Sequence, residues 1–257
     1  MAERHELWMT QYGRVYYKDE TEKASRLNIF KENVEFIESF NKEGTRSYKI
    51  AVNKFADLTN EEFREVRNGY KESHFCRKSP SFMYQNVSAI PATMDWRKKG
   101  AVTEIEIKDQ GQCAVATMER IKQLSTGKLI SFSEQELVDC NTSEDQGCNE
   151  GLTIEANYPY EAANRTCNSK KKSNRAATIS SIEDIFENSE VNLLKAVANQ
   201  SVFVAIDVGG SAFQFYSSSV FTNDYNINLD HGVIVIGYGN TVHETKYWLV
   251  KNSWEIS

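Results

Sequence analysis

Between residues 20 and 43, apolar side chains recur every three or four positions in a stretch that is otherwise charged. That spacing places them on one side of a helix, so it predicts a single amphipathic helix that buries one face against another part of the chain. Gly44 is a suitable residue to end this helix. The predicted apolar face consists of Leu27, Phe30, Val34, Ile37 and Phe40.

The density of charge changes along the chain. Charged side chains make up 29 of residues 1–88, but only 37 of the remaining 169 residues. Prolines discourage helix at Ser-Pro-Ser, residues 79–81, and at Ala-Ile-Pro, residues 89–91. We therefore expect a helical, well-solvated unit over residues 1–88 and a more compact unit over residues 89–257.

The second unit carries helix signals first and strand signals later. Apolar periodicity predicts helices over residues 114–126, where Gly127 follows, and over residues 190–199. Later stretches are rich in β-branched and aromatic residues with glycines between them, which predicts strands and hence an α+β body with two subdomains. The predicted strands are 201–208, 231–238 and 246–251. Two capping boxes mark further helix starts: Thr59 with Glu62, and Ser133 with Glu136.

Composition excludes several classes of protein. The net charge of −6 gives no electrostatic reason to expect nucleic acid as a partner. No apolar run approaches the roughly 18 residues that span a bilayer, so we expect no membrane partner either. Three prolines and no repeat period argue against collagenous or solenoid architectures. The chain is expected to be a globular monomer.

Five cysteines suggest disulfides. Four of them lie between positions 113 and 167, and Cys76 stands apart, which suggests two disulfides and one free thiol. A zinc site is the rival interpretation, but there is no CxxC pair and no histidine near the cluster, so we expect no metal. The four clustered cysteines are Cys113, Cys140, Cys148 and Cys167.

Asn-x-Ser/Thr sequons point, like the cysteines, to an oxidising compartment. They matter only if the chain enters a secretory lumen, and such triplets also arise by chance. The first residues are charged and contain no apolar signal segment, so either the start is truncated or the chain stays in the cytosol. We favour truncation. The sequons begin at Asn86, Asn141, Asn164 and Asn199.

Two motifs in the first unit resemble papain-family prosegments. The predicted helix carries the complete interrupted Glu-Arg-Phe-Asn-Ile-Asn signature of that family, and Ala51-x-Asn53-x-Phe55-x-Asp57 is similar to its second motif, with Ala in place of the leading Gly. An ordinary amphipathic helix explains the apolar positions of the signature but not its asparagines. The signature residues are Glu22, Arg26, Phe30, Asn33, Ile37 and Asn41.

Motifs in the second unit continue the resemblance in family order. They are Pro91-Ala-Thr-Met-Asp-Trp-Arg97, Gln110-Gly-Gln-Cys113, Ser133-Glu-Gln-Glu-Leu-Val-Asp-Cys140, Gly147-Cys148-Asn149, Leu229-Asp-His231-Gly and Lys251-Asn-Ser-Trp254. The likeness is closest to plant vacuolar enzymes of the senescence-associated type. It implies an α-helical inhibitory prosegment and a shortened two-lobed body, with a helical lobe, a β-barrel lobe and the substrate between them. It also implies a vacuolar, lysosomal or secreted protein whose prosegment is removed at acidic pH.

The resemblance implies catalytic roles for three residues. His231 matches the base that takes the thiol proton and returns it to the leaving amine. Asn252 matches the residue that orients the imidazole, and Gln110 matches the amide donor of the oxyanion hole. Each has a plainer interpretation taken singly: a strand-end histidine, a turn asparagine and a loop amide.

The nucleophile is the exception. In the family, a catalytic Cys follows shortly after the cysteine of the Gln-Gly-x-Cys motif, but here Cys113 runs directly into Ala114-Val-Ala-Thr-Met-Glu119. The simplest alignment deletes about seven residues, including that Cys, and leaves Cys113 as a weak substitute near a helix start. A second shortening follows Gly151, where part of the substrate-binding wall is expected. We therefore predict a cysteine endopeptidase zymogen with impaired catalysis.

The resemblance also implies pairings and partners. It pairs Cys113 with Cys148 and Cys140 with Cys167, and leaves Cys76 unpaired; spacing alone leaves the other pairings of the four open. No cofactor is implied. The expected partners are a protein or peptide substrate, or related cysteine proteases bound through the prosegment. The alternatives to a protease zymogen are an inhibitor-like binding protein and a remnant that folds poorly.

Overall fold

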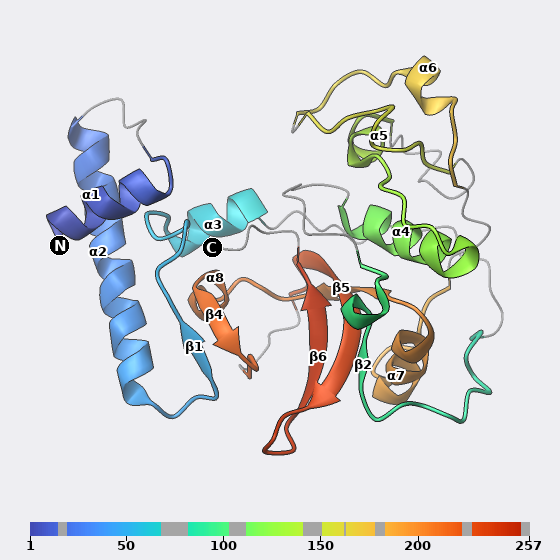
Figure 1. Ribbon diagram of the computed structural model, residues 1–257. Helices are drawn as coiled ribbons and strands as arrows, with labels where there is room; N and C mark the ends of the chain where they lie inside the picture. The colour runs from blue at the N-terminus through green and yellow to red at the C-terminus, as the bar shows by residue number, and fades with distance from the viewer. Residues whose placement is uncertain are drawn as a thin grey trace. The chain divides into compact units, whose positions relative to one another are not determined.

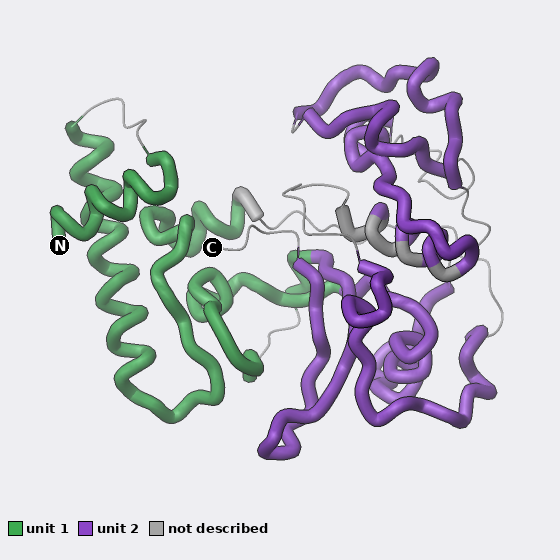
Figure 2. The backbone as a smooth tube through the Cα atoms, viewed as in Figure 1, with its two compact units in different colours: residues 1–71, 205–231, 257 green, residues 72–204, 232–256 purple. Residues whose placement is uncertain are grey.

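The computed structural model describes residues 1–14, 20–67, 82–102, 112–140, 151–161, 163–177, 183–222 and 228–252. The chain forms two compact units, shown in green and purple in Figure 2. Unit 1 combines residues 1–71 with residues 205–231. Unit 2 combines residues 72–204 with residues 232–256. The first unit therefore contains a segment from far along the chain, which the sequence did not predict.

Unit 1 is a small helical assembly with one two-stranded sheet (Figure 1). The predicted amphipathic helix is confirmed: α2 runs over Glu20–Glu43 and ends before Gly44, whose φ is 65°. β1 pairs antiparallel with β4 across a separation of more than 160 residues in the sequence. The other elements are α1 (Ala2–Gln11), β1 (Tyr48–Ile50), α3 (Asn60–Arg67), α8 (Ser211–Gln214) and β4 (Tyr216–Ser219).

The core of unit 1 is built on the apolar face of α2. Phe30, Val34 and Ile37 are buried there, and Leu27 and Phe40 are half-buried at the edges. α1 covers this face with Trp8, whose ring centroid lies 5.3 Å from that of Phe30. Phe215, from the distant segment, is completely buried in the same cluster. The apolar face of α2 thus packs against Trp8 of α1 and against Phe215 of the distant segment.

Unit 2 contains a four-stranded sheet with one helix beside it. The strands are ordered β2-β5-β3, and β6 pairs antiparallel with β5. The predicted strands and the predicted helix over 190–199 are confirmed; Trp96 joins that helix to the sheet through a 2.8 Å hydrogen bond from its Nε1 to the Val197 carbonyl. The elements are β2 (Met94–Asp95), η1 (Arg97–Lys99), α7 (Glu190–Asn199), β3 (Val202–Ile206), β5 (His231–Asn240) and β6 (Lys246–Lys251).

The rest of unit 2 is helical and has a separate small core. The predicted helix over 114–126 is confirmed as α4, and Gly127 ends it with a left-handed φ of 72°. An apolar cluster of Val115, Met118, Phe132 and Leu152 lies beneath it. The elements are α4 (Gln112–Thr126), α5 (Glu134–Cys140) and α6 (Ser169–Lys172). Together the two units have the mixed helix and sheet content of an α+β protein. None of the helices within the described ranges is long and apolar enough to cross a membrane.

The two predicted capping boxes differ in the structure. At α3 the box is reciprocal: Thr59 N donates to Glu62 Oε2 at 2.9 Å, and Glu62 N donates to Thr59 Oγ1 at 3.2 Å. At α5, Glu136 N donates to Ser133 Oγ, but the Glu136 carboxylate accepts from Thr153 N at 2.8 Å. The second glutamate thereby ties α5 to the following loop.

β2 approaches β5 closely at Gly237, and a substitution there tests this contact. A Cβ at this position would overlap the Met94 carbonyl oxygen, so Gly237→Ala has to displace β2 or β5. We expect the free energy of unfolding to fall by about 1–3 kcal/mol, measured by urea denaturation. The matched control is Gly210→Ala, because a Cβ there would have no neighbour within 4 Å. Equal midpoints for the two variants would contradict this account of the sheet.

Candidate active site

His231, the predicted base, is the first residue of β5 and is 7% exposed. The backbone just before it is held in place: Asp230 N donates to the Ile206 carbonyl at 3.2 Å, and Asp230 Oδ1 accepts from Val208 N at 2.9 Å. These two hydrogen bonds fix the start of β5 against the end of β3.

Asn252, the predicted orienting residue, follows directly after β6 and is half-buried. In the β5–β6 ladder, Ile234 pairs with Lys251. Because the strands are antiparallel, the first residue of β5 and the residue after β6 belong to the same end of this hairpin. That placement is compatible with a His–Asn pair, which stays a prediction.

The structure places only the backbone of the weak substitute nucleophile. Cys113 is the second residue of α4, and its side chain is outside the described part of the structure, as are Gln110, Cys76 and Cys148. The oxyanion-hole amide, the unpaired cysteine and the Cys113–Cys148 pairing therefore stay predictions. Further along α4, buried Glu119 accepts a hydrogen bond from Phe132 N at 3.1 Å and so anchors the helix.

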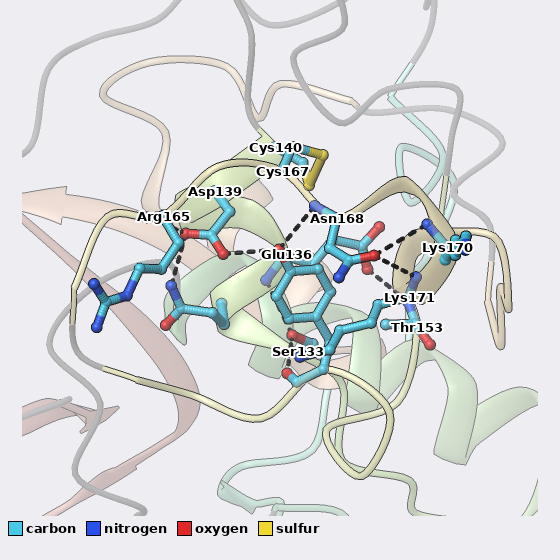
Figure 3. Close-up of a disulfide and its surroundings, with 12 residues drawn as sticks. Ser133, Glu136, Asp139, Cys140, Thr153, Arg165, Cys167, Asn168, Lys170 and Lys171 are labelled. Atoms are coloured by element: carbon cyan, nitrogen blue, oxygen red, sulfur yellow. Dashed lines mark hydrogen bonds between the residues drawn. A yellow bond between two sulfur atoms is a disulfide. The ribbon is translucent and has the colours of Figure 1, made fainter.

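A disulfide joins Cys140, at the end of α5, to Cys167, and it is one of the two pairs that the resemblance implies (Figure 3). Asp139 beside it accepts hydrogen bonds from the Tyr158 hydroxyl at 2.7 Å and from Arg165 N at 2.8 Å. Burial opposes the charge of Asp139, but these hydrogen bonds outweigh it and lower the pKa of the carboxyl. Among the described residues, no group of three or more His, Cys, Asp or Glu side chains forms a metal site.

Three polar residues of the prosegment signature bind the backbone in and next to the second motif. Arg26 Nη1 donates to the Asp57 carbonyl at 3.0 Å and to Glu62 Oε2 at 2.7 Å. Asn33 Nδ2 donates to the carbonyls of Ala56 and Leu58, both at 2.9 Å. Asn41 exchanges two hydrogen bonds with the backbone of Ile50. An amphipathic helix needs none of these groups, so this contact explains the signature.

Six consecutive carbonyls, from Asn53 to Leu58, each accept a hydrogen bond from a side chain. Irregular backbone in a buried position needs such partners, because water does not supply them there. The donors are Trp8, Arg14, Arg26, Asn33 and Gln214.

Gln214 anchors this motif to the distant segment of the chain, and sequence reasoning missed it. The side chain is 2% exposed, and its Nε2 donates to the carbonyls of Phe55 and Leu58 at 3.3 and 3.2 Å. Its Oε1 accepts from Asn60 Nδ2 at 3.1 Å, and its backbone carbonyl accepts from Asn53 Nδ2 at 2.7 Å. A single glutamine in a helix of four residues carries no sequence signal of this role.

Strand pairing and aromatic rings extend the same interface. β1 lies against β4, and Ser47 Oγ reaches the Val220 carbonyl at 3.1 Å. The ring centroids of Tyr48 and Phe221 are 4.5 Å apart. The prosegment-like residues and residues 211–222 therefore share backbone, amide and aromatic contacts within unit 1.

The comparisons with known proteins identify the family. The model of the papain family cysteine protease matches residues 90–257, and that of the cathepsin propeptide inhibitor domain (I29) matches residues 5–63. The chain belongs to the papain family of cysteine proteases and carries the propeptide. Because the peptidase body matches as well as the propeptide, a protease zymogen is favoured over a free-standing inhibitor.

Its relatives are of the senescence-associated type. The senescence-specific cysteine protease SAG39 of Oryza sativa subsp. indica is 53% identical over 280 positions, covering 99% of this chain and 80% of the relative. SAG12 of Arabidopsis thaliana is 48% identical, covering 99% of this chain and 81% of the relative. Since the SAG39 alignment has 280 positions and this chain has 257 residues, at least 23 positions of the relative have no counterpart here.

Solved structures agree. A recombinant stem bromelain precursor superposes with a TM-score of 0.87 at 37% identity, covering 98% of this chain and 87% of the other. The Amb a 11 cysteine protease of ragweed pollen, in its proform, gives a TM-score of 0.83 at 35% identity, covering 97% and 83%. The papain-like fold with its helical prosegment is thus confirmed.

Replacing Gln214 tests the anchor. Gln214→Leu leaves the carbonyls of Phe55 and Leu58 without this donor, so we expect unit 1 to lose about 1–3 kcal/mol of stability. Hydrogen exchange at Ala51 reports the loss, because its N–H donates to the Phe215 carbonyl at 2.8 Å. Ser218→Ala, at an exposed position on β4, is the control. Unchanged exchange at Ala51 in the Leu variant would remove the anchoring role.

Glu62 makes the stability of unit 1 depend on pH. Its hydrogen bond from Arg26 lowers the pKa of the carboxyl below the ordinary 4.5. Because the folded pKa is the lower one, the stabilisation is present above 4.5 and is lost as the pH falls through the folded pKa. Glu62→Gln should therefore flatten the fall of the unfolding midpoint between about pH 5 and pH 3. Gln at the exposed Glu65 is the control, and an equal fall in both variants contradicts the assignment.

Proposed function

We propose that this zymogen of a papain-like cysteine endopeptidase has impaired turnover, because its nucleophile segment is missing. The observation that carries the proposal is the direct passage from Gln110-Gly-Gln-Cys113 into Ala114-Val-Ala-Thr-Met-Glu119. The 23 or more unmatched positions in the SAG39 alignment support internal shortening of this chain.

In this proposal, the chain keeps the residues that hold and polarise a peptide bond. His231 moves the proton between thiol and leaving amine, Asn252 orients its imidazole, and Gln110 donates to the oxyanion. The fixed start of β5 and the shared end of the β5–β6 hairpin support the first two roles. The reaction would be hydrolysis of unfolded or storage protein through a thioester.

Cys113 is a poor replacement for the missing nucleophile. Its position in the first turn of α4 favours a thiolate, since the helix N-terminus lowers a thiol pKa. A nucleophile displaced by even 1 Å, however, loses about a hundredfold in rate. If Cys113 pairs with Cys148, no thiol remains at all.

We propose that the chain folds in the secretory lumen and acts in a vacuole, a lysosome or outside the cell. The Cys140–Cys167 disulfide supports this, because such bonds persist in oxidising compartments. Within the same proposal, residues 1–88 are the prosegment and residues 89–257 the peptidase body. The partners are the protein substrate and the prosegment itself.

Restoring the missing residues tests the proposal. The chain is processed at acidic pH and assayed with a fluorogenic peptide and a thiol-directed label, beside a variant that receives the unmatched SAG39 residues after Cys113. We expect kcat/KM of the unaltered chain to be at least about a hundredfold lower than that of the repaired chain. His231→Ala should abolish the repaired activity.

Two results would overturn impairment. One is equal turnover of the unaltered and repaired chains. The other is labelling of Cys113 together with turnover that Cys113→Ala removes.

A further inference from the structure

The sequons differ in solvent exposure and in hydrogen bonding. Three of the four lie in described parts of the chain: those that begin at Asn86, Asn164 and Asn199. The fourth, at Asn141, lies outside the described residues. An N-linked glycan is large and hydrophilic, so its asparagine amide and the first sugar have to face solvent in the folded protein. The exposure and hydrogen bonding of each sequon therefore separate them.

Asn164 meets this requirement. Residues 163–168 form a loop without regular structure, and Asn164, Arg165 and Thr166 are all exposed. The loop backbone is fixed by the Cys167 disulfide and by the hydrogen bond from Arg165 N to Asp139. Within the described part of the chain, the side chains of Asn164 and Thr166 make no hydrogen bond, so a glycan there displaces none.

Asn86 meets it in the same way. It lies at the end of a turn over residues 83–86, and both Asn86 and Ser88 are exposed. Lys195 Nζ holds this turn by donating to the Gln85 carbonyl at 2.7 Å. Neither sequon side chain forms a hydrogen bond to any residue that the structure describes.

Asn199 does not. It is the last residue of α7, and its Nδ2 donates to the Lys195 carbonyl at 2.8 Å, within the last turn of the helix. The hydroxyl residue of this sequon, Ser201, is 2% exposed. A glycan on Asn199 would leave Nδ2 only one N–H for this helix-terminal hydrogen bond and would lie beside a buried sequon residue.

We propose that Asn86 and Asn164 carry N-linked oligosaccharides and that Asn199 carries none. In the transfer, Nδ2 bonds to C1 of the first N-acetylglucosamine of a lipid diphosphate-linked oligosaccharide. The C1–O bond to the diphosphate breaks, the lipid diphosphate leaves, and the amide gives up one proton; nothing is oxidised or reduced. The inference rests on the proposed secretory route, which the Cys140–Cys167 disulfide supports.

Site-by-site mass spectrometry tests the inference. The full chain, with a secretory signal ahead of Met1, is expressed in plant cells, and its glycans are removed by amidase in ¹⁸O-water, which marks each occupied asparagine as labelled aspartate. We expect label at Asn86 and Asn164 and none at Asn199. Asn164→Gln and Thr166→Ala should each remove one glycan from the intact mass, whereas Arg165→Lys should keep it. Thr166→Ala retains Asn164, so it separates loss of the sequon from loss of the side chain.

The two possible failures are distinguishable. If Cys140 and Cys167 stay reduced although the added signal delivers the chain to the lumen, the disulfide that supports the secretory route does not form, and that proposal loses its support. If the disulfide has formed but Asn86 or Asn164 is unmodified, or Asn199 is modified, the selection of sites by the exposure and hydrogen bonding of the whole sequon is wrong.

Discussion

Side-chain hydrogen bonds to the backbone from Asn53 to Leu58 hold unit 1 together. This stretch has no run of backbone partners, so amide, guanidinium and indole groups from three directions satisfy its carbonyls. Asn33 and Arg26 approach from α2, Trp8 from α1 and Gln214 from α8. Losing one of these donors removes a hydrogen bond from the backbone that links α1, α2 and α8. The helix, the motif and the distant segment therefore depend on one another.

Local pattern was enough for most elements and for the family. The stripe of α2, the Thr59–Glu62 capping box and the β-branched stretches of β5 and β6 encode their structure within a few residues. Long-range contacts were not predictable in this way. Gln214 meets Phe55 across 159 residues, and nothing local distinguishes it from an ordinary surface glutamine. The same limit hid α1, whose helix is stabilised by packing Trp8 on Phe30.

The candidate active site rests on family order, and the roles of its residues stay predictions. His231 and Asn252 were found from family order, and the structure puts them at strand ends, where backbone pairing positions side chains well. The proposed loss of the nucleophile is an inference from the sequence alone, because the residues before α4 lie outside the described part of the structure. α4 nonetheless keeps its buried face, with Val115 and Met118 in the core and Glu119 bonded to Phe132. The packing of α4 is thus independent of which residues precede it in the sequence.

Unit 1 contains segments from both parts of the chain, so cleavage of the chain and release of the cleaved piece are two separate events. Residues 1–71 share a core with residues 205–231, so hydrolysis of one peptide bond between these two segments would produce a nicked complex and not two free fragments. Departure of the severed piece requires it to dissociate, which uncovers Phe215 and Gln214 to water. A freshly cut molecule would keep its blocking segment until acid, dilution or digestion draws it away, and the lifetime of that complex would set the delay before any catalysis.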